Sequence, residues 1–352
     1  MSKRILAVTT FLLAAAGSIF AQADTSKPTT PTIFPGETHF KNIRQLTFGG
    51  QNAEAYWSGD GTMLSLQSSR DGHDCDAIYT MKADGSDLRQ VSDGRGTTTC
   101  SMIQPGNKFI IYASTTLVDS TCPPKPDFSK GYVWALYKGY DIFKANIDGS
   151  NAVRLTNSEG YDAECVFSPD GSKILFTSVR SGDLELWMMN ADGSNPEQLT
   201  HGIGYDGGGW FSADGQSIVW RASRPQGAEL KEYTELLAEG LVRPHALEIY
   251  TMSLKDRKPI QLTSNGAANF APYFHPDGKH IIYCSNSGDP KGRNFDLFLI
   301  EIATKKIEQI TFNDTFDGFP MWTMDGKKFV FASNRNGKIP HETNVFVADW
   351  VW

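Results

Sequence analysis

Short apolar runs alternate with polar turns along most of the chain. The clearest segment, Tyr161 to Thr200, contains apolar runs at Cys165 to Ser168, Lys173 to Ser178 and Glu185 to Asn190, and a shorter fourth run closes it. The turn Asp170-Gly171 separates the first two runs, and Asp-Gly pairs tolerate the positive φ that tight hairpins require. The pattern therefore predicts four short antiparallel strands.

This four-strand pattern occurs six times. One landmark is an aliphatic residue followed by Thr or Ser, at Leu46-Thr47, Val91-Ser92, Leu155-Thr156, Leu199-Thr200, Leu262-Thr263 and Ile310-Thr311. The other is a turn pair 14 or 15 residues later, at Asp60-Gly61, Pro105-Gly106, Asp170-Gly171, Asp214-Gly215, Asp277-Gly278 and Asp325-Gly326. The second strand of a unit is apolar at consecutive positions, as in Ile174 to Phe176, which indicates burial on both faces. Six such units predict an all-β, six-bladed β-propeller of four-stranded blades.

The two ends of the repeat array complement each other. The last unit has a third strand at Asn344 to Ala348 and then reaches Trp352 without a fourth strand. The first landmark, in contrast, has no unit before it. We therefore expect Lys41 to Thr47 to supply the outer strand of the last blade, so that both termini hold one sheet and the ring has no open edge.

The residues before the first repeat predict export. Lys3-Arg4, an apolar run from Ile5 to Ala16 and the small-residue sequence around Ala21 to Ala23 are typical of a secretory signal peptide, residues 1–23. Residues 24–39 are rich in Pro and Thr and are expected to be a linker, and residues 40–352 form the propeller. No later apolar stretch is long enough to span a membrane. We expect a secreted, periplasmic monomer.

Charge and cysteine content narrow the class of protein. Without Lys3 and Arg4, 31 of the 33 basic residues remain against 40 acidic ones, which argues against nucleic acid as a partner because such binding needs a basic stripe. The chain has five cysteines. Cys75 and Cys122 fall in or beside the loops between the second and third strands of the first two units, so we expect them to form a disulfide.

The long insertions all follow the second strand of a unit. They are Thr115 to Gly139, Arg224 to Ala246, Ser285 to Phe295 and Asn334 to Thr343. In a propeller, these loops share one face of the disc with the loops that enter each first strand, whereas the other face carries only short turns. Because binding groups concentrate on loops held by a rigid scaffold, we expect the insertion-bearing face to be the functional one.

A series of polar residues precedes the innermost strands on that face. Eight residues before each turn pair stand Asn52, Thr97, Asp162, Asp206, Asn269 and Asp317. They are expected to surround the mouth of the central channel and to bind a cation, a sugar or a basic peptide end. The alternative is that these side chains cap their own turns by local hydrogen bonds.

Arginines and aromatic residues form a second set of candidates near the same face. Arg70, Arg180, Arg224 and Arg335 follow the second strands and could recognise an anion, or could pair with the Asp residues to hold a loop on its blade. Tyr132 and Trp134 in the first long insertion could form a platform for sugar rings or a partner. The next insertion predicts a helix from about Glu229 to Glu239, which could act as a lid or as a static clamp.

The segment FSPDGSKILFTSVRSGDLELWMMNADGSNPEQLT resembles the WD40-like (PD40) repeat of TolB-type propellers, which also occurs in propeller domains of prolyl-oligopeptidase-like enzymes. The resemblance covers nearly all of the chain after the linker and implies the fold and export. In the TolB family, the propeller docks a peptidoglycan-associated lipoprotein and follows a separate α/β domain. Only Asp24 to His39 lies before the first strand here, so that domain is expected to be absent. No GxSxG motif accompanies the resemblance to the peptidases.

Two functions remain open on the sequence. We expect an exported, non-catalytic module that binds an envelope protein or a cell-wall polysaccharide through its insertion-bearing face. The alternative is a carbohydrate-active enzyme, a lyase or hydrolase of oligosaccharides, that uses a divalent cation at the channel mouth. No set of nucleophile, base and orienting residue is evident, which favours binding without a cofactor. A fold shared by both classes does not decide between them.

Overall fold

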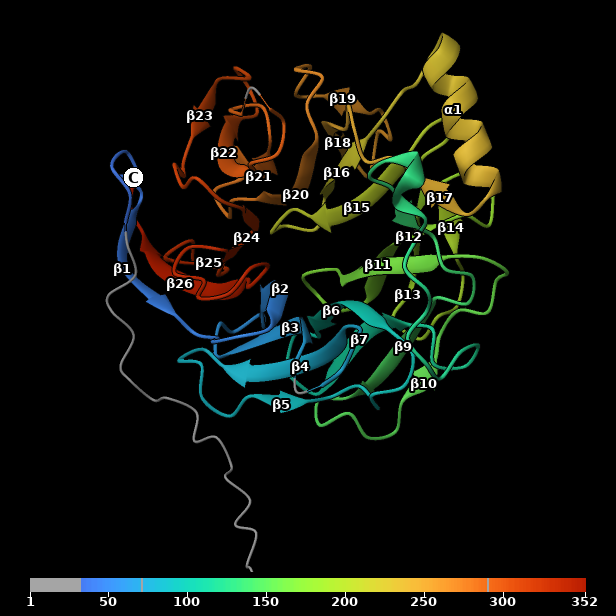
Figure 1. Ribbon diagram of the computed structural model, residues 1–352, viewed down its shortest axis with the longest axis horizontal. Helices are drawn as coiled ribbons and strands as arrows, with labels where there is room; N and C mark the ends of the chain where they lie inside the picture. Colours follow the sequence, from blue (N-terminus) through green and yellow to red (C-terminus); the bar gives the residue numbers. More distant parts are fainter. Residues whose placement is uncertain (1–32, 71, 290) are drawn as a thin grey trace, which may run out of the picture.

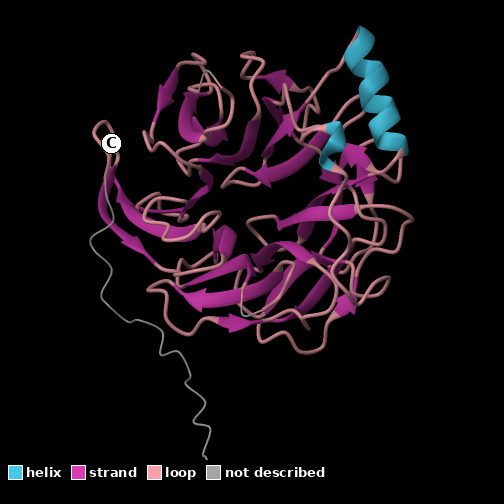
Figure 2. Ribbon diagram, in the orientation of Figure 1, coloured by secondary structure: helices cyan, strands magenta, loops and turns pink. Residues whose placement is uncertain are grey.

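The computed structural model describes residues 33–70, 72–289 and 291–352. Six four-stranded antiparallel sheets, the blades, stand around a central axis (Figures 1 and 2). The six-bladed all-β propeller predicted from the repeats is therefore confirmed. The predicted signal peptide and the first part of the predicted linker lie outside the described residues.

In blades 1 to 5, the strands follow one another from the channel outward in sequence order, and in blade 6 the N-terminal strand β1 takes the outermost place. Blade 1 consists of β2 (Gln51–Trp57), β3 (Met63–Ser69), β4 (Ala77–Lys82) and β5 (Arg89–Gln90). Blade 2 consists of β6 (Thr98–Ile103), β7 (Phe109–Ser114), β9 (Asp141–Asn146) and β10 (Val153–Arg154). Blade 3 consists of β11 (Asp162–Phe167), β12 (Lys173–Ser178), β13 (Glu185–Asn190) and β14 (Glu197–Gln198). Blade 4 consists of β15 (Asp206–Phe211), β16 (Ser217–Ala222), β18 (Glu248–Ser253) and β19 (Ile260–Gln261). Blade 5 consists of β20 (Asn269–Phe274), β21 (His280–Ser285), β22 (Asp296–Glu301) and β23 (Ile307–Gln309). Blade 6 consists of β24 (Asp317–Trp322), β25 (Lys328–Ser333), β26 (Asn344–Trp350) and β1 (Phe40–Gln45).

The last blade closes the ring as expected. The N-terminal strand β1 pairs antiparallel with β26, with Phe40 opposite Trp350 and Gln45 opposite Phe346. Thr47, just after β1, continues the contact, because its Oγ1 accepts a hydrogen bond of 2.8 Å from the Val345 amide. Both ends of the chain thus hold one sheet together, which closes the ring of blades.

The recurring Leu-Thr landmark fastens the fourth strand of a blade to the third. In blade 3, Thr200 Oγ1 accepts a hydrogen bond of 2.8 Å from the Leu186 amide and donates one of 2.6 Å to Glu185. In blade 4, Thr263 donates to Glu248 at 2.5 Å in the same way. A hydroxyl at this position accepts a hydrogen bond from a third-strand amide in all six blades, which explains why the landmark recurs.

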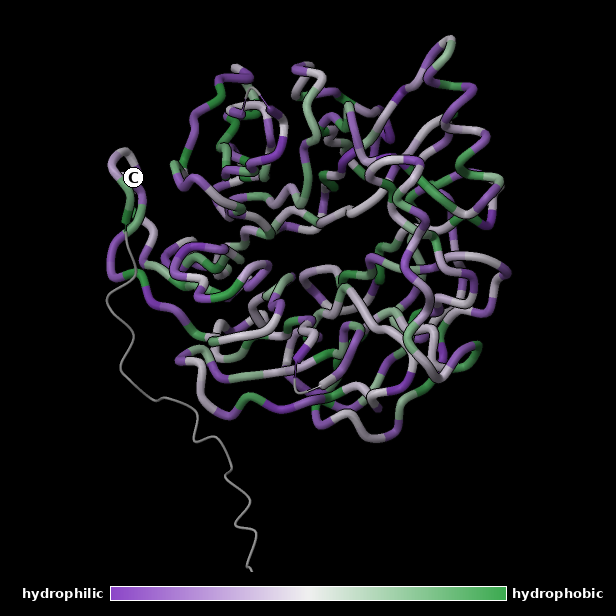
Figure 3. Tube along the Cα trace, viewed as in Figure 1, coloured by the Kyte–Doolittle hydropathy of each residue, from purple (hydrophilic) through white to green (hydrophobic). Residues whose placement is uncertain are grey.

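The core lies between the blades rather than in one centre. Hydrophobic stretches follow the strands, and hydrophilic ones mark the turns (Figure 3). The largest fully buried side chains come from all parts of the ring and include Trp220, Trp322, Tyr283, Phe167, Phe176 and Phe331. Most belong to second strands, such as β12 and β25, whose consecutive apolar residues face a neighbouring blade on each side.

Every innermost strand carries a β-bulge near its middle. The pairing register shifts within β2, β6, β11, β15, β20 and β24. One residue of each bulge has φ between 45° and 62°, the left-handed region that few non-glycine residues adopt. These six bulge residues are Glu54, Cys100, Glu164, Gly208, Ala271 and Phe319. A bulge of this kind redirects a side chain that would otherwise follow the regular alternation of the strand.

Two long insertions meet above the ring. In the first, β8 (Trp134–Ala135) pairs antiparallel with β17 (Leu241–Val242) of the second. The second insertion also contains the only α-helix of the described residues, α1 (Gly227–Ala238), which begins two residues before the predicted start and buries Tyr233 and Leu236. Both insertions therefore lie on the same face, as the loop positions predict. None of the helices in the described ranges is long and apolar enough to cross a membrane.

Candidate functional site

A cavity of about 910 Å³ occupies the central channel on the insertion-bearing face. Its floor is a layer of aromatic rings. Tyr56 of blade 1 and Trp210 of blade 4 meet across the channel with ring centroids 4.7 Å apart, and Trp210 lies 5.1 Å from Tyr273. A separate cavity of about 420 Å³, lined by residues of the short turns, lies on the other side of this layer. The upper cavity is therefore a cup, which we call the channel cup.

The bulge residues line the channel cup and give it two unlike halves. Blades 1 to 3 contribute Glu54, Cys100 and Glu164. Blades 4 to 6 contribute only uncharged groups at the equivalent positions, namely Gly208, Ala271 and Phe319. At the bulge positions, acidic groups are thus confined to one half of the wall, whereas the two arginines of the lining, Arg221 and Arg293, come from blades 4 and 5.

An ion pair spans the cup between blades 3 and 4. Arg221 of β16 pairs with Glu164 through Nη2, and the same nitrogen donates to the Tyr205 hydroxyl at 2.6 Å. Glu164 also accepts hydrogen bonds from Thr177 at 2.7 Å and from the Gly208 amide at 2.8 Å. This carboxylate is consequently well satisfied. Arg221 is only 8 % exposed.

Gly208 makes this ion pair possible. Its φ is 62°, and a Cβ at this position would lie 1.8 Å from Arg221 Nη1. Gly208 therefore makes room for the guanidinium group, whereas its neighbours Gly207 and Gly209 lie against Glu164 and Tyr205 and against Leu175 and Leu186. A glycine inside a strand often marks such a close approach.

Glu54 differs from Glu164 in its surroundings. Burial raises its pKa from 4.5 to about 7, and the negative charge of Glu164 acts in the same direction. A hydrogen bond with Cys100 and the positive charge of Arg221 oppose this rise only partly. Within the described ranges, no basic side chain forms an ion pair with Glu54. Its proton is therefore lost near neutral pH.

Aromatic side chains form the opposite half and the roof of the channel cup. Phe270, Phe295, Phe316 and Phe319 follow one another with ring centroids between 5.2 and 6.3 Å apart. Trp134, from the strand pair of the insertions, packs 5.2 Å from Phe270. The Arg221 guanidinium lies 5.4 Å from the Trp134 ring, so the tryptophan covers the ion pair.

The six residues predicted to surround the channel mouth are buried between the blades. Asn52, Asp162, Asp206, Asn269 and Asp317 are 0 % exposed, and Thr97 is 7 % exposed. None of them lines the channel cup. In blade 2, the register places Thr98 rather than Thr97 in the series, because Thr98 lies opposite Ser114 as Asn52 lies opposite Ser68. The turn of that blade has Asn107, with φ of 55°, in the position that glycine takes elsewhere.

The arginine series pairs with this buried series. Arg180 binds Asp162 at 2.9 Å, and Arg224 binds Asp206 at 2.8 Å. These contacts tie the loop after the second strand to the start of the first strand of the same blade. The pairing corresponds to the structural alternative raised from the sequence. In blade 1, where an amide replaces the carboxylate, the Arg70 guanidinium lies 5.8 Å from the Tyr79 ring.

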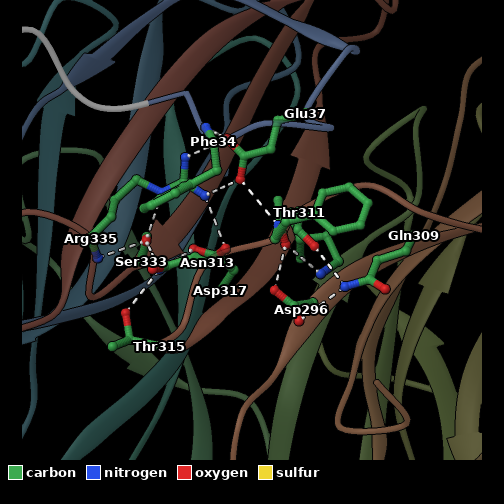
Figure 4. Close-up of polar contacts among 12 residues, drawn as sticks. Phe34, Glu37, Asp296, Gln309, Thr311, Asn313, Thr315, Asp317, Ser333 and Arg335 are labelled. Atoms are coloured by element: carbon green, nitrogen blue, oxygen red, sulfur yellow. Dashed lines mark hydrogen bonds and ion pairs between the residues drawn. The ribbon is translucent and has the colours of Figure 1, made fainter. Parts of the chain in front are cut away.

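The version of this pair in blade 6 is fully buried (Figure 4). Arg335 donates to Asp317 and to Glu37, each at 2.9 Å, and all three side chains are 0 % exposed. Glu37 comes from the end of the predicted linker, which therefore packs against the blade. Burial raises the pKa of nearby Asp296 to about 7, and the charge of Asp317 adds to this effect.

The insertions place the remaining candidates. Tyr132 and Trp134 both line the channel cup, and Trp134 Nε1 donates to the Tyr132 hydroxyl at 3.1 Å. Tyr132 is 66 % exposed. Cys75 and Cys122 are bonded in the structure, with Cα atoms 5.6 Å apart. Among the described residues, no group of three or more His, Cys, Asp or Glu side chains is arranged to hold a metal ion.

The bulge residues were not predicted from the sequence, because the apolar pattern predicts regular strands without bulges. The predicted series lies two residues before the bulge, at positions that face a neighbouring strand. A usable signal was the polar residue in the third place of otherwise apolar strands, as in Glu54 and Glu164. Arg221, inside an apolar second strand, was a further signal of a buried charge that needs a partner.

Comparisons with known proteins agree with this architecture. A model of the TolB beta propeller domain matches residues 125–235. A protein assigned as TolB in Agrobacterium tumefaciens superposes with a TM-score of 0.59 at 17% identity, over 88% of this chain and 97% of that chain. Hydrazine synthase of Kuenenia stuttgartiensis gives 0.55 at 14% identity, over 85% and 40%. An oligogalacturonate lyase in complex with manganese gives 0.50 at 15% identity, over 88% and 93%. At these identities, the structural likeness concerns the fold.

Proposed function

This chain is a TolB-like six-bladed β-propeller, and we propose that it is an exported, periplasmic module that binds an envelope protein or polymer through its insertion-bearing face. The observation that carries the proposal is the channel cup, which lies on this face with aromatic walls and a few charged groups. Cavities of this composition are the usual ligand sites of proteins. The predicted signal peptide supports the location.

Exposed apolar side chains support the same face. Eight large hydrophobic residues are exposed in its loops: Phe48, Leu117, Val118, Phe128, Tyr132, Ile203, Phe312 and Ile339. On the opposite face, the exposed large hydrophobic residues within the described ranges are Met324, in a short turn, and Trp352, which packs against His275 and His280. Apolar residues at the surface favour association when they occur together with a site.

A catalytic role is the second candidate. Glu54 favours it, because a carboxyl with a pKa of about 7 can exchange a proton near neutral pH. The fold shared with an oligogalacturonate lyase is compatible with this role. The test is turnover of an oligosaccharide panel with and without chelator, in which product formation by the wild type but not by Glu54→Gln would establish an enzyme.

The binding proposal is tested by capture from an envelope extract with a matched pair of variants. Tyr132→Ser removes an exposed ring at the channel cup, and Met324→Ser removes an exposed side chain from the opposite face. We expect the wild type and Met324→Ser to retain the same partner, and Tyr132→Ser to retain it about tenfold less, as for an aromatic contact at an interface. Equal retention by all three proteins would refute binding through this face.

A further inference from the structure

The two halves of the channel cup differ in chemistry in a way that specifies a ligand. We propose that the cup takes an organic ammonium group carried on an apolar body, with the ammonium at Glu54 and the body along the phenylalanine half. This inference rests on the proposed function, since it concerns the same cavity, and it adds the chemical class of the group that enters.

Two lining carboxyls, Glu54 and Asp76, have no basic partner among the described residues. The lining also contains two arginines, Arg221 and the exposed Arg293 on the opposite half. Glu164 is neutralised by Arg221 and has further donors in Thr177 and Gly208. Asp76, at the edge of the cup, accepts hydrogen bonds from Ser69 and from Gln67, the latter at 2.9 Å. Glu54 has the Cys100 thiol beside it and no basic partner among the described residues. An incoming cation would complete this set of charges.

Arg221 does not make the cup a binding site for an anion. Its guanidinium is shared between Glu164 and Tyr205 and lies 5.4 Å from the Trp134 ring that covers it. Only Nη2 makes these contacts, and a ligand carboxylate or phosphate that reached the other two nitrogens would also face the carboxylates of Glu54 and Glu164. The same charges that attract a cation therefore repel an anion.

Aromatic rings around Glu54 suit an ammonium rather than a bare metal ion. Tyr56, Tyr140 and Tyr161 line the same half of the cup, and Tyr140 and Tyr161 are in edge contact at 5.6 Å. The negative faces of such rings attract organic cations. A metal ion would need several oxygen, nitrogen or sulfur ligands that converge on one point.

The opposite half provides a matching apolar surface. Phe270 and Phe295 stack at 5.2 Å, and Phe316 and Phe319 continue the surface at 6.0 Å from each other. Its bulge positions are uncharged, because Gly208, Ala271 and Phe319 occupy them. The exposed Arg293, two residues before Phe295, also lines the cup, and its positive charge favours an ammonium placed away from it, at Glu54. A ligand that bears its charge at one end can thus contact both halves at once within about 910 Å³.

The test uses small probes of one shape and three charges: benzylammonium, benzyl alcohol and phenylacetate. Binding is followed by tryptophan fluorescence and by calorimetry at pH 8. We expect benzylammonium to bind at least about tenfold more tightly than benzyl alcohol, and phenylacetate more weakly than either. Glu54→Gln should remove the preference for the ammonium and leave benzyl alcohol unchanged. Glu159→Gln, an exposed carboxyl on the same face, should behave as the wild type.

Proton exchange gives a second readout. Because Glu54 must lose its proton to hold a cation, benzylammonium should bind about tenfold more weakly at pH 6 than at pH 8, as a pKa of about 7 requires. Benzyl alcohol should show no such dependence. A simply structural role for Glu54 would not produce this difference between the two probes.

The outcomes separate this inference from the proposed function. Equal binding of benzylammonium and benzyl alcohol, unchanged by Glu54→Gln, would overturn the ammonium site and still support a binding cavity. No binding of any probe would also overturn it, and the Tyr132→Ser capture experiment would then decide the proposed function alone. If the ammonium is preferred, amidated dipeptides with a free or an acetylated amino terminus identify whether a chain end or a lysine side chain is the source.

Discussion

Replacing Arg335 with methionine tests how strongly the buried charges hold the last blade. Methionine preserves the unbranched apolar stem and removes only the guanidinium. The side chains of Arg335, Asp317 and Glu37 are 0 % exposed, so two carboxylates would remain in the protein interior without their counterion. Removal of one partner of a buried pair costs about 3–5 kcal/mol, because water cannot replace it. We expect Arg335→Met to lower the free energy of unfolding by that amount.

The matched control is Arg224→Met at the same position of blade 4. Its side chain is 35 % exposed, and it pairs with Asp206 alone. Water can reach this site after the substitution, so we expect a loss that is smaller by at least about 2 kcal/mol. The comparison separates the effect of burial from the effect of losing an arginine at this place in the repeat.

The assay is equilibrium unfolding in urea at pH 7.5, with the slope of the transition as a check that the unfolded state is unchanged. The triple variant Arg335→Met, Asp317→Asn, Glu37→Gln should regain part of the stability, because it leaves no buried charge. The reasoning is refuted if Arg335→Met costs less than about 1 kcal/mol, if it equals Arg224→Met, or if the triple variant is no more stable than the single one.

Three further predictions concern other parts of the molecule. A left-handed backbone costs about 1–2 kcal/mol for a residue with a Cβ. Gly208→Ala should destabilise the fold by more than this amount, because the Cβ would also displace Arg221. Gly278→Ala, with φ of 69° and open space around it, should show the backbone cost alone in the same urea assay. Replacing both cysteines of the disulfide with serine should cost up to about 4 kcal/mol for a sequence separation of 47 residues, and non-reducing peptide mapping of the wild type should recover the linked peptides. The pKa of Asp296 is raised to about 7 in the folded state. Its stabilising contribution is therefore present in acid and is lost as the pH rises from about 4 to 7. Asp296→Asn should lose less stability than the wild type between pH 5 and pH 8, and equal losses would contradict the assignment.

The architecture could be predicted because each of its causes is local in the sequence. The Leu-Thr landmark marks a hydroxyl that bonds the third strand, and the Asp-Gly pair marks a hairpin, so both recur with the blade. The missing fourth strand of the last unit and the extra strand before the first one predicted the closure through β1. The helix was also predictable, since Tyr233 and Leu236 lie on one face and Gly240 follows its end.

The site could be predicted only in part, because its geometry depends on a backbone irregularity. In regular strands, the residues two positions before each bulge would face the channel. The bulges move that role to Glu54, Glu164 and their equivalents, and leave Asp162 and Asp317 between strands, where arginines neutralise them. The pairing of β8 with β17 joins segments about one hundred residues apart, and no local pattern announces it.

The six bulges also separate two tasks that most strands combine. The side chains that point into the sheets hold the blades together, whereas the residue at each kink faces the lumen. The identities of these six residues, here Glu, Cys, Glu, Gly, Ala and Phe, therefore define the chemistry of the lumen, although Gly208 is also constrained by Arg221. Reading them in related chains would sort those chains by what they accommodate, and rewriting them would offer a way to engineer a new receptor on an unaltered frame.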